Sequence, residues 1–589
     1  AYDRRAATVG TDGRIGGGPI RARRAAFATR NRSSFVSVAL RSTLAVLGFA
    51  PALVAAQMPA AGPLKHEAKP TSAAISAQDL MTRLYVFADD SMQGRATATP
   101  GHDKGVEYIA AELRKLGLKP MGDNGTYFQT VPLVRRAMDP ASTMTVDGQV
   151  LAFGTDFLYQ AINGGPTKFD NAAVVWGGQL GDTTNILADV SGRFVLLRPS
   201  LGAMNQRALM AQLGRYTGAA GIGIVLPFPA IPPAQARAAQ VPRVTLPGAP
   251  MMPGLPGGIV QLTAGAAVKL LGMPLDSAKF GMAGKAVSGD IRMKDEPAPS
   301  RNVIAMLEGR DKALKGQIVS VGGHSDHVGL TPTAVDHDSL KAVNWALNRH
   351  AVENGKPAAG PVRDSIVRAV VAGLKSSGRR DSIRNGADDD GSGSMAVLEI
   401  AEAFAKAKQK PKRSMLFLWY TGEEVGLLGS RHYTDHPTVP RDSVIANLNI
   451  DMLGRGRTDD IKGGGDAYLQ LVGSRRLSTQ LGDLVEAVNG RRKAKLTFDY
   501  TLDADGHPEN IYCRSDHYNW ARYGIPVTFF TTGLHGDYHQ STDEPQYIDY
   551  PHFASVTQFI ADVMGELANA KDKPVVDKPK PDPNGTCRQ

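Results

Sequence analysis

Two adjacent glutamates, Glu423 and Glu424, follow the apolar run 417–420 after a single Thr-Gly pair. Carboxylates this close raise each other's pKa unless a positive group lies beside them. If one of them binds a metal ion, it stays ionised, and its neighbour can face a coordinated water and act as a base. The pair therefore suggests metal-assisted acid–base chemistry.

Four further stretches carry histidine or acidic residues. They are GGHSDHVG (322–329), GADDDGSG (386–393), NIDMLG (449–454) and GLHGDYHQSTD (533–543). Because unpaired carboxylates in a pocket repel one another, these clusters need a cation if they meet. Two histidines and several carboxylates suit zinc, and they exceed what one tetrahedral zinc needs. Two zinc ions about 3.5–4 Å apart, sharing a carboxylate and a water, would use them all.

The elements that must position these clusters are strands and helices in alternation. From residue 300 onward, apolar strands are predicted at 316–324, 414–422, 443–451 and 525–533, with an amphipathic helix at 394–407. This alternation predicts an α/β fold with a mixed, largely parallel sheet flanked by helices. Ligands bind beyond the carboxyl ends of the strands in such sheets, which is where the clusters fall.

The length of 589 residues predicts two or more domains. Short β-branched runs between Gly- and Pro-rich loops predict a β-rich module at 139–290. Helical patterns occupy 76–138 and an insertion at 333–384, which would form either a lid beside the cleft or a plain surface insertion. Residues 57–75 are expected to be a linker, and the Pro- and Lys-rich residues 569–589 a disordered tail.

The formal net charge of +10 is concentrated at the N-terminus. Residues 1–56 hold nine arginines, no lysine and two aspartates, which account for +7 of it. The remaining chain is nearly neutral, so no nucleic-acid partner is expected. The apolar run 44–56 follows several arginines and is too short to span a bilayer, so 1–56 is interpreted as a signal peptide with an upstream leader. Secretion or a periplasmic location follows, without a stable membrane anchor.

The chain has two cysteines, Cys513 in the predicted folded body and Cys587 in the predicted tail. Two cysteines so placed exclude a disulfide framework and a cysteine-based zinc site. Any metal site must therefore use histidines and carboxylates.

The stretches GGHSDHVG, NGADDDGSGS, YTGEEVGLLGS, NIDMLGR and DYHQSTD together resemble the dizinc aminopeptidases of peptidase clan MH, which also includes glutamate carboxypeptidase-like enzymes. The resemblance covers about residues 76–565. It implies a phosphorylase/hydrolase-like dizinc exopeptidase domain formed by 76–138 and 291–568. It also implies that the β-rich insert at 139–290 is a protease-associated domain.

The resemblance further implies two Zn²⁺ ions per chain and a role for each matching residue. One zinc would be bound by His324, Asp389 and Asp451, and the other by Asp389, Glu424 and His539, with Asp389 bridging. Glu423 would be the general base, Asp326 would orient the imidazole of His324, and Tyr538 would donate a hydrogen bond to the developing oxyanion.

Some of these roles could fall to neighbouring residues. His327, Asp388 and Asp390 are placed where they could exchange roles with His324 and Asp389, and cobalt or manganese could replace zinc. The family usually has asparagine after the bridging aspartate, where this chain has Asp390. The resemblance also implies a cis peptide bond between Asp389 and Asp390.

The resemblance implies an aminopeptidase that acts on peptides with a dizinc-bound water, and the interpretation of residues 1–56 as a signal peptide adds that it is secreted. The first alternative is a carboxypeptidase of the same clan, for which Arg455, Arg457, Arg475 and Arg476 are candidates to grip a terminal carboxylate. The sequence also leaves room for a single-zinc glutaminyl cyclase and for a non-catalytic, receptor-like protein.

Overall fold

The computed structural model describes most of the chain after the N-terminal region. The described residues are 58, 61–159, 167–182, 187–199, 212–248, 258–374 and 376–589. The predicted signal peptide and leader, 1–56, lie outside them. Within this part of the chain, none of the helices is both long enough and apolar enough to pass through a bilayer.

A nine-stranded mixed sheet forms the centre of the protein. Its order is β1-β14-β18-β15-β19-β22-β20-β21, and β2 also pairs with β14. The strands are β1 (Lys119–Pro120), β2 (Phe128–Val131), β14 (Ser300–Leu307), β15 (Ile318–His324), β18 (Ser414–Tyr420), β19 (Val444–Ile450), β20 (Tyr468–Val472), β21 (Thr497–Asp499) and β22 (Val527–Thr531). The four neighbours β18, β15, β19 and β22 run parallel, whereas β14 is antiparallel to β18 and β20 to β22. The predicted mixed α/β fold is confirmed.

Strand β18 shows why this sequence forms a central strand. All seven of its residues are buried. Because successive side chains of a strand point to opposite faces, Phe417 and Trp419 pack into the core on one side of the sheet and Leu416 and Leu418 into the core on the other. Burial on both faces explains the continuous apolar run that precedes the two glutamates.

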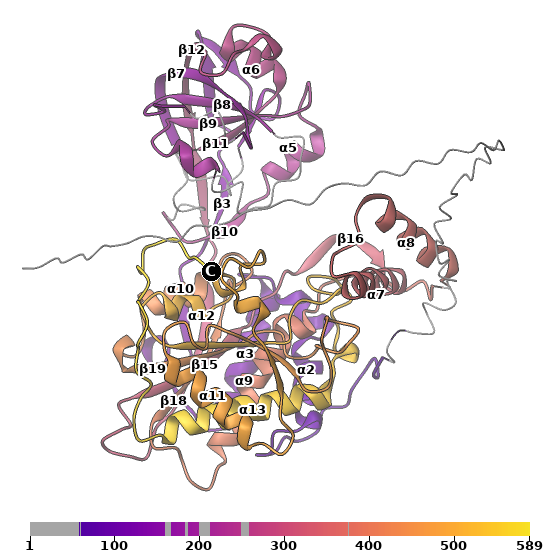
Figure 1. The fold of residues 1–589 in the computed structure, drawn as a ribbon, viewed down its shortest axis with the longest axis vertical. Helices are drawn as coiled ribbons and strands as arrows, with labels where there is room; N and C mark the ends of the chain where they lie inside the picture. The colour runs from indigo at the N-terminus through magenta and orange to yellow at the C-terminus, as the bar shows by residue number, and fades with distance from the viewer. Residues whose placement is uncertain are drawn as a thin grey trace, which may run out of the picture. The chain divides into compact units, whose positions relative to one another are not determined.

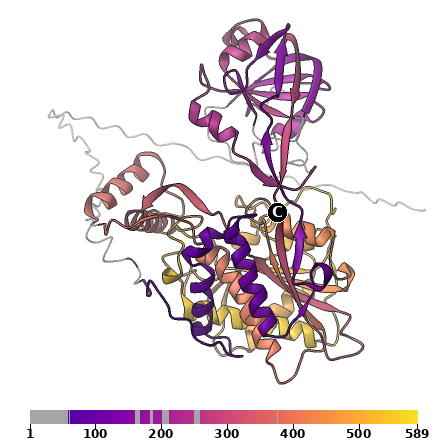
Figure 2. The same ribbon diagram turned by 180° about the vertical axis from the view of Figure 1, so that it is seen from behind.

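Helices cover both faces of this sheet. Five contribute to the core on one face: α2 (Ala77–Phe87), α3 (Pro100–Lys115), α9 (Gly393–Ala405), α11 (Thr479–Arg491) and α13 (Tyr550–Asn569). Two contribute to the core on the other face: α10 (Leu428–Asp435) and α12 (His517–Ala521). Figure 1 labels these helices around the sheet, and the indigo helices α2 and α3 are easiest to follow from behind in Figure 2.

A second sheet of eight strands is built from residues 143–291, with order β5-β4-β12-β7-β8-β9-β11-β6. Its strands are β4 (Thr143–Val146), β5 (Gln149–Leu151), β6 (Phe157–Tyr159), β7 (Thr167–Gln179), β8 (Phe194–Arg198), β9 (Gly221–Val225), β11 (Ile259–Leu262) and β12 (Ala283–Ile291). The same part of the chain contains the helices α5 (Pro233–Ala239) and α6 (Ala264–Leu271). A three-stranded sheet joins β10 (Arg243–Thr245), β3 (Val134–Met138) and β13 (Met293–Pro297). The identity of this β-rich part as a protease-associated domain stays a prediction.

The predicted insertion at 333–384 contains α7 (His337–Asn354) and α8 (Gly360–Gly373), and the short strands β16 (Leu330–Asp336) and β17 (Arg380–Ile383) pair at its base. Asp336 directly precedes α7 and caps its N-terminus, because its side chain accepts a hydrogen bond from the Ser339 backbone N–H. Its Lys341 forms an ion pair with Asp537, two residues before His539.

The prediction of a disordered tail at 569–589 is wrong. Cys587 forms a disulfide bond with Cys513, 74 residues earlier in the chain. The tail also makes hydrogen bonds to the folded body, among them one from the Arg522 guanidinium to the Pro583 carbonyl at 3.1 Å. Composition alone predicted disorder because the tail has few apolar residues, but a covalent link and polar contacts hold it in place.

Candidate metal centre

The five predicted metal ligands meet at the carboxyl edge of the parallel strands. His324 is the last residue of β15, and Asp451 directly follows β19, the neighbouring strand. Glu424 follows β18 after a short turn, His539 lies in the loop after β22, and Asp389 lies in the short π-helical segment η6 (Ala387–Ser392) that leads into α9. The sheet order places these segments side by side, so residues more than 200 positions apart in sequence converge.

One part of the cluster surrounds the Nε2 atom of His324. This atom lies 3.3 Å from Asp389 Oδ1, 3.7 Å from Asp451 Oδ1 and 3.9 Å from Glu423 Oε2. His324 is 1% exposed, so water does not screen these contacts.

The other part surrounds the Nε2 atom of His539. This atom lies 2.9 Å from Glu424 Oε2 and 3.0 Å from Asp389 Oδ2. Asp389 therefore points one carboxylate oxygen toward each of two imidazoles. A carboxylate in this position can be shared between two cations.

Several atoms that can coordinate a metal ion are buried in this cluster without a hydrogen bond, which shows that these residues fit metal ions. Among the described residues, His324 Nε2, Asp389 Oδ2, Asp451 Oδ1 and His539 Nε2 are buried and make no hydrogen bond of suitable geometry, although His539 Nε2 and Asp389 Oδ2 lie only 3.0 Å apart. Buried polar atoms are nearly always satisfied in folded proteins, and an ion accounts for a group of unsatisfied ones. Imidazole nitrogens and carboxylate oxygens are the donors that zinc accepts.

The electrostatics of the cluster point the same way. Burial raises the pKa of Glu423 well above its usual range, and the neighbouring carboxylates of Glu424 and Asp451 add to this effect. For His539, burial lowers the pKa, but Asp389 and Glu424 raise it more, to about 10. The site thus has a strongly negative potential that favours a cation.

His327 lies in the same cluster and is a further histidine that the sequence offers as a ligand. Its Nδ1 atom lies 2.8 Å from Glu424 Oε1 but 3.7 Å from Asp389 Oδ2. His539 approaches both carboxylates, whereas His327 contacts only one at hydrogen-bond distance. These distances favour His539 as a ligand, although His327, Asp389 and Glu424 also offer ligand atoms within 4.8 Å of one another.

Asp390 points away from the ligand atoms. Its Oδ2 accepts a hydrogen bond from the backbone N–H of His324 at 3.0 Å, and its Oδ1 accepts from those of Gly393 at 2.8 Å and Met452 at 3.2 Å. Because both oxygens accept, the amide group of an asparagine would face one of these donors. This explains the aspartate at the position where the resembled family has asparagine. The Asp389–Asp390 peptide bond is cis, as the resemblance implied.

The carboxylate of Asp388 is also engaged in contacts with neighbouring residues outside the ligand cluster. Its Oδ2 lies 3.2 Å from His535 Nε2, and its Oδ1 accepts hydrogen bonds from Ser392 and from the backbone of Gly454. Its own backbone N–H donates to Asp543. Neither Asp388 nor Asp390 replaces Asp389.

The side chain of Asp326 does not make the predicted contact with the imidazole of His324. The His324 Nδ1–H donates to the backbone carbonyl of Asp326 at 3.1 Å, whereas the Asp326 carboxylate lies 3.9 Å from that nitrogen. The carboxylate instead accepts hydrogen bonds from the Thr97 hydroxyl at 2.6 Å and from the backbone N–H of Glu423 at 3.2 Å. The main chain of Asp326 therefore holds the imidazole, and its side chain positions Glu423.

This geometry gives Asp326 a testable signature. Asp326→Ala removes the acceptor for the Glu423 N–H, and we expect kcat to fall by about 100-fold. Asp326→Asn keeps an acceptor oxygen there and can donate to the Thr97 hydroxyl, so we expect a loss of less than about tenfold. Steady-state kinetics of both variants measure the two effects. If asparagine is as damaging as alanine, the negative charge acts on His324, as the resemblance implied.

A cleft opens over the ligand cluster. Asp389, Glu423 and Asp451 lie at its polar side, and the aliphatic or aromatic side chains around them are Met452, Leu502, Ile511, Phe529 and Leu534. No described residue of the insertion 333–384 lines this cleft.

Tyr538 also lines the cleft, and its ring stacks on that of His539 with centroids 3.8 Å apart. Burial and the carboxylates of Asp389 and Glu424 raise the pKa of Tyr538, so its hydroxyl stays protonated and can donate a hydrogen bond. This position suits its predicted role.

Arg514 is a cleft residue that the sequence analysis missed. It pairs with Glu509 at 3.2 Å and donates to the Tyr538 hydroxyl at 3.4 Å. Its position directly before Ser515 and Asp516 in the stretch RSDHYNW was the available signal. The four arginines proposed from the sequence to bind a terminal carboxylate do not line the cleft and form ion pairs elsewhere. These pairs are Arg455 with Asp537, Arg457 with Asp549, Arg475 with Asp483 and Glu486, and Arg476 with Asp503.

A further buried group with metal-ligating side chains consists of His337, Asp381 and Glu544. The Arg379 guanidinium already pairs with both carboxylates. His337 Nε2 lies 2.8 Å from Glu544 Oε2. This group is therefore neutralised by protein side chains and ties the insertion to the loop that carries His539.

The fold and this cluster together define an α/β protein with a candidate metal centre at the strand ends. Comparison with known families adds a more specific class. The model of peptidase family M28 matches residues 302–564, which include all five ligand candidates and Glu423. This match covers less than half of the chain, so it shows a similarity of this segment to peptidase family M28.

Individual relatives match over limited stretches. Leupeptin-inactivating enzyme 1 of Streptomyces exfoliatus is 42% identical over 77 residues, 13% of this chain and 18% of that protein. A probable leucine aminopeptidase of Arthroderma benhamiae is 29% identical over 194 residues, 31% of this chain and 49% of that protein. The chain thus spans about half the length, or less, of these curated relatives.

Solved structures that match the chain include an aminopeptidase from Aneurinibacillus sp. strain AM-1 and a zinc aminopeptidase from Bacillus subtilis. The first has a TM-score of 0.45 and 17% identity, with 86% of this chain and 97% of that chain covered. The second has a TM-score of 0.43 and 16% identity, with 86% and 99% covered.

Proposed function

We propose that this protein is a secreted, zinc-dependent exopeptidase that removes N-terminal residues from peptides. The observation that carries the proposal is the convergence of His324, Asp389, Glu424, Asp451 and His539, with four of their donor atoms buried and unpartnered. The M28 match of this segment and the names of its relatives, which include leucine aminopeptidases, support the same reaction class.

Two metal ions fit the donor set. His324, Asp389 and Asp451 would hold one, and Asp389, Glu424 and His539 the other. When bound, two divalent cations neutralise the carboxylates, polarise a carbonyl group and lower the pKa of a coordinated water.

Glu423 is the proposed general base. Its carboxylate lines the cleft beside Asp389 and Asp451, and the ligand set proposed above does not include it. The hydrogen bond from its backbone to Asp326 fixes its position. From there it would accept a proton from the attacking water and return it to the leaving amine.

The cleft suits an N-terminal residue with an apolar side chain. Leu502, Ile511 and Phe529 offer an apolar wall, and the carboxylates at its polar side attract a positively charged α-amine. The Tyr538 hydroxyl would donate a hydrogen bond to the carbonyl oxygen as negative charge develops there.

A secreted or periplasmic location rests on the sequence of residues 1–56 and has support from the disulfide bond. Cys513 and Cys587 are paired, and disulfides persist in oxidising compartments.

Turnover of a panel of aminoacyl-anilides tests this function. We expect cleavage of leucyl and other apolar derivatives, loss of activity on treatment with a chelator, and recovery on adding zinc back. The matched control is the same panel with the α-amine acetylated, which we expect to resist cleavage because the positive charge is gone. Equal cleavage of free and acetylated substrates would contradict an aminopeptidase.

A carboxypeptidase is the second candidate because Arg514 lines the cleft. A guanidinium there could bind a terminal carboxylate. Peptides blocked at one end or the other separate the two activities: a carboxypeptidase would cleave N-acetylated peptides with a free carboxylate, and Arg514→Met would abolish that cleavage.

A further inference from the structure

One wall of the cleft is formed by a loop, residues 500–513, that has little regular structure. It contains two single-turn 3-10 helices, η8 (Thr501–Asp503) and η9 (Ile511–Cys513). Leu502 and Ile511, one at each end of the loop, line the cleft. The shape of this wall therefore depends on what holds the two ends of the loop together.

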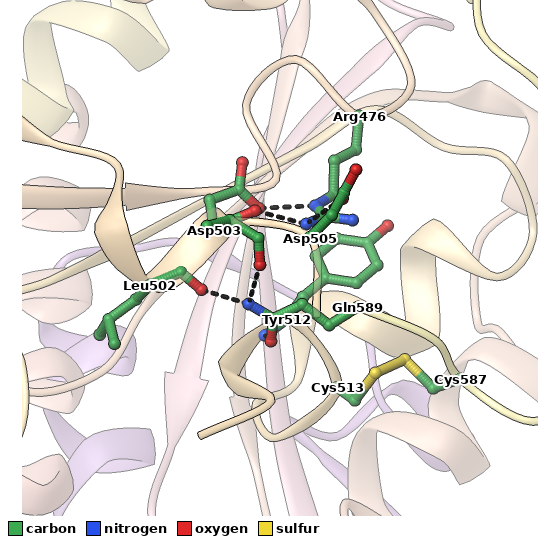
Figure 3. The surroundings of a disulfide bond; sticks show 9 residues. Arg476, Leu502, Asp503, Asp505, Tyr512, Cys513, Cys587 and Gln589 are labelled. Atoms are coloured by element: carbon green, nitrogen blue, oxygen red, sulfur yellow. Dashed lines mark hydrogen bonds and ion pairs between the residues drawn. A yellow bond between two sulfur atoms is a disulfide. The ribbon is translucent and has the colours of Figure 1, made fainter. Parts of the chain in front are cut away.

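The tail holds them, as Figure 3 shows. The disulfide to Cys587 anchors the end of the loop at Cys513. The Gln589 side-chain oxygen accepts a hydrogen bond from the Tyr512 backbone at 3.1 Å, and its side-chain amide donates to the carbonyls of Leu502 and Ala504. One glutamine thus bonds both halves of the loop.

The loop has a second anchor in the body of the protein. Arg476 pairs with Asp503 at 2.6 Å and with Asp505 at 3.2 Å. Its guanidinium also lies 4.5 Å from the centroid of the Tyr512 ring (Figure 3). Arg476 thus also touches both ends of the loop, and the tail adds a covalent bond at Cys513 and the hydrogen bonds of Gln589 to this anchor.

The metal-ligand side of the cleft is held independently. Ser515, two residues after Cys513, donates to Asp451 Oδ2 at 2.9 Å and accepts from the Asn449 side chain at 2.8 Å. These bonds do not involve the tail. Loosening the loop should therefore change the apolar wall and leave the ligand cluster in place.

We propose that residues 587–589 are a positioning element for substrate specificity: through the Cys513–Cys587 disulfide and Gln589, they hold the loop 500–513 in the shape that accepts the side chain of the substrate. This inference rests on the proposed exopeptidase function. Without the tail contacts, the loop must lose conformational freedom each time a substrate binds, which weakens binding.

Two variants and a matched control test the proposal. The variants are Cys513→Ser with Cys587→Ser, and Gln589→Ala. The control, Asp577→Ala, removes a different tail contact, the hydrogen bond from the Thr479 backbone at the start of α11. For leucyl-anilide we expect both loop variants to raise KM by about tenfold and to change kcat by less than about twofold. Zinc content should stay at the wild-type value, and the control should behave like wild type.

The selectivity for leucyl- over alanyl-anilide should fall in the same variants, since the wall touches the side chain of the substrate. Wild-type protein treated with a non-chelating phosphine reductant should behave like the double serine variant. An unchanged KM in both loop variants would overturn the proposal. A fall in kcat that is equal for the leucyl- and alanyl-anilides, with KM unchanged, would overturn it as well.

Hydrogen–deuterium exchange of residues 500–513 separates this inference from the proposed function. We expect faster exchange there in both loop variants and not in Asp577→Ala, whatever the substrate is. If wild type cleaves no aminoacyl-anilide, the proposed function fails, and exchange alone decides: unchanged exchange in the loop overturns the positioning role.

Discussion

Replacing Glu423 with glutamine is expected to lower kcat by about 10³-fold and to leave zinc content unchanged. The glutamine keeps the size of the side chain and the backbone bond to Asp326 but has no carboxylate to accept the proton of the attacking water. The ligand atoms of His324 and Asp451 lie on other strands and stay in place. Steady-state kinetics, with metal analysis of the same preparation, measure both quantities.

A suitable control is Glu353→Gln on α7, a change of the same chemistry at an exposed site where the glutamate pairs with Arg349. We expect it to keep wild-type turnover. Near-full activity in Glu423→Gln would remove Glu423 from the chemistry. A loss of zinc together with activity would make it a ligand instead of a base.

Replacing Asp389 with alanine is expected to abolish activity and to reduce zinc well below two ions per chain. Asp389 is the residue whose two oxygens face both His324 and His539, at 3.3 Å and 3.0 Å. Without this carboxylate, two neighbouring cations would repel each other with less negative charge between them. Residues that only orient a metal ligand typically change the metal affinity by up to about 100-fold, and we expect the affinity for zinc to fall by more than that here.

Asp381→Asn is the matched control for metal content. Asp381 belongs to the other buried group that contains histidine and carboxylates, with His337 and Glu544. Because Arg379 already neutralises that group, we expect zinc content to be unchanged. Loss of one zinc in Asp381→Asn would show that this group binds metal, and full zinc occupancy in Asp389→Ala would contradict the bridging role.

Metal stoichiometry also distinguishes a dizinc exopeptidase from a glutaminyl cyclase and from a non-catalytic protein of this fold. A glutaminyl cyclase would hold one zinc, and a non-catalytic relative would have lost ligands. Every ligand candidate is present and lies within 3.7 Å of at least one other, including both residues that only the second ion requires, Glu424 and His539.

The sequence predicted the centre of the fold because its signals were strong and local. The run 414–420 is apolar throughout after its first residue, as a strand buried on both faces requires, and a short turn brings Glu423 and Glu424 to the sheet edge. Similar runs ended at His324 and just before Asp451. Parallel neighbours then place these ends together without any further information.

Other features depend on contacts that no local pattern encodes. The pairing of Cys513 with Cys587 joins segments 74 residues apart, and the composition of the tail predicted disorder. The bond from His324 to the backbone carbonyl of Asp326, in place of the carboxylate, follows from the path of the chain after β15. Arg514 was overlooked because it has no position in the motifs that drew attention to the site.

Anomalous diffraction from crystals of the zinc-loaded protein, collected at the zinc absorption edge, tests the central claim most directly. We expect two peaks, one among His324, Asp389 and Asp451 and the other among Asp389, Glu424 and His539. A single peak, or peaks away from these residues, would contradict a centre of two metal ions.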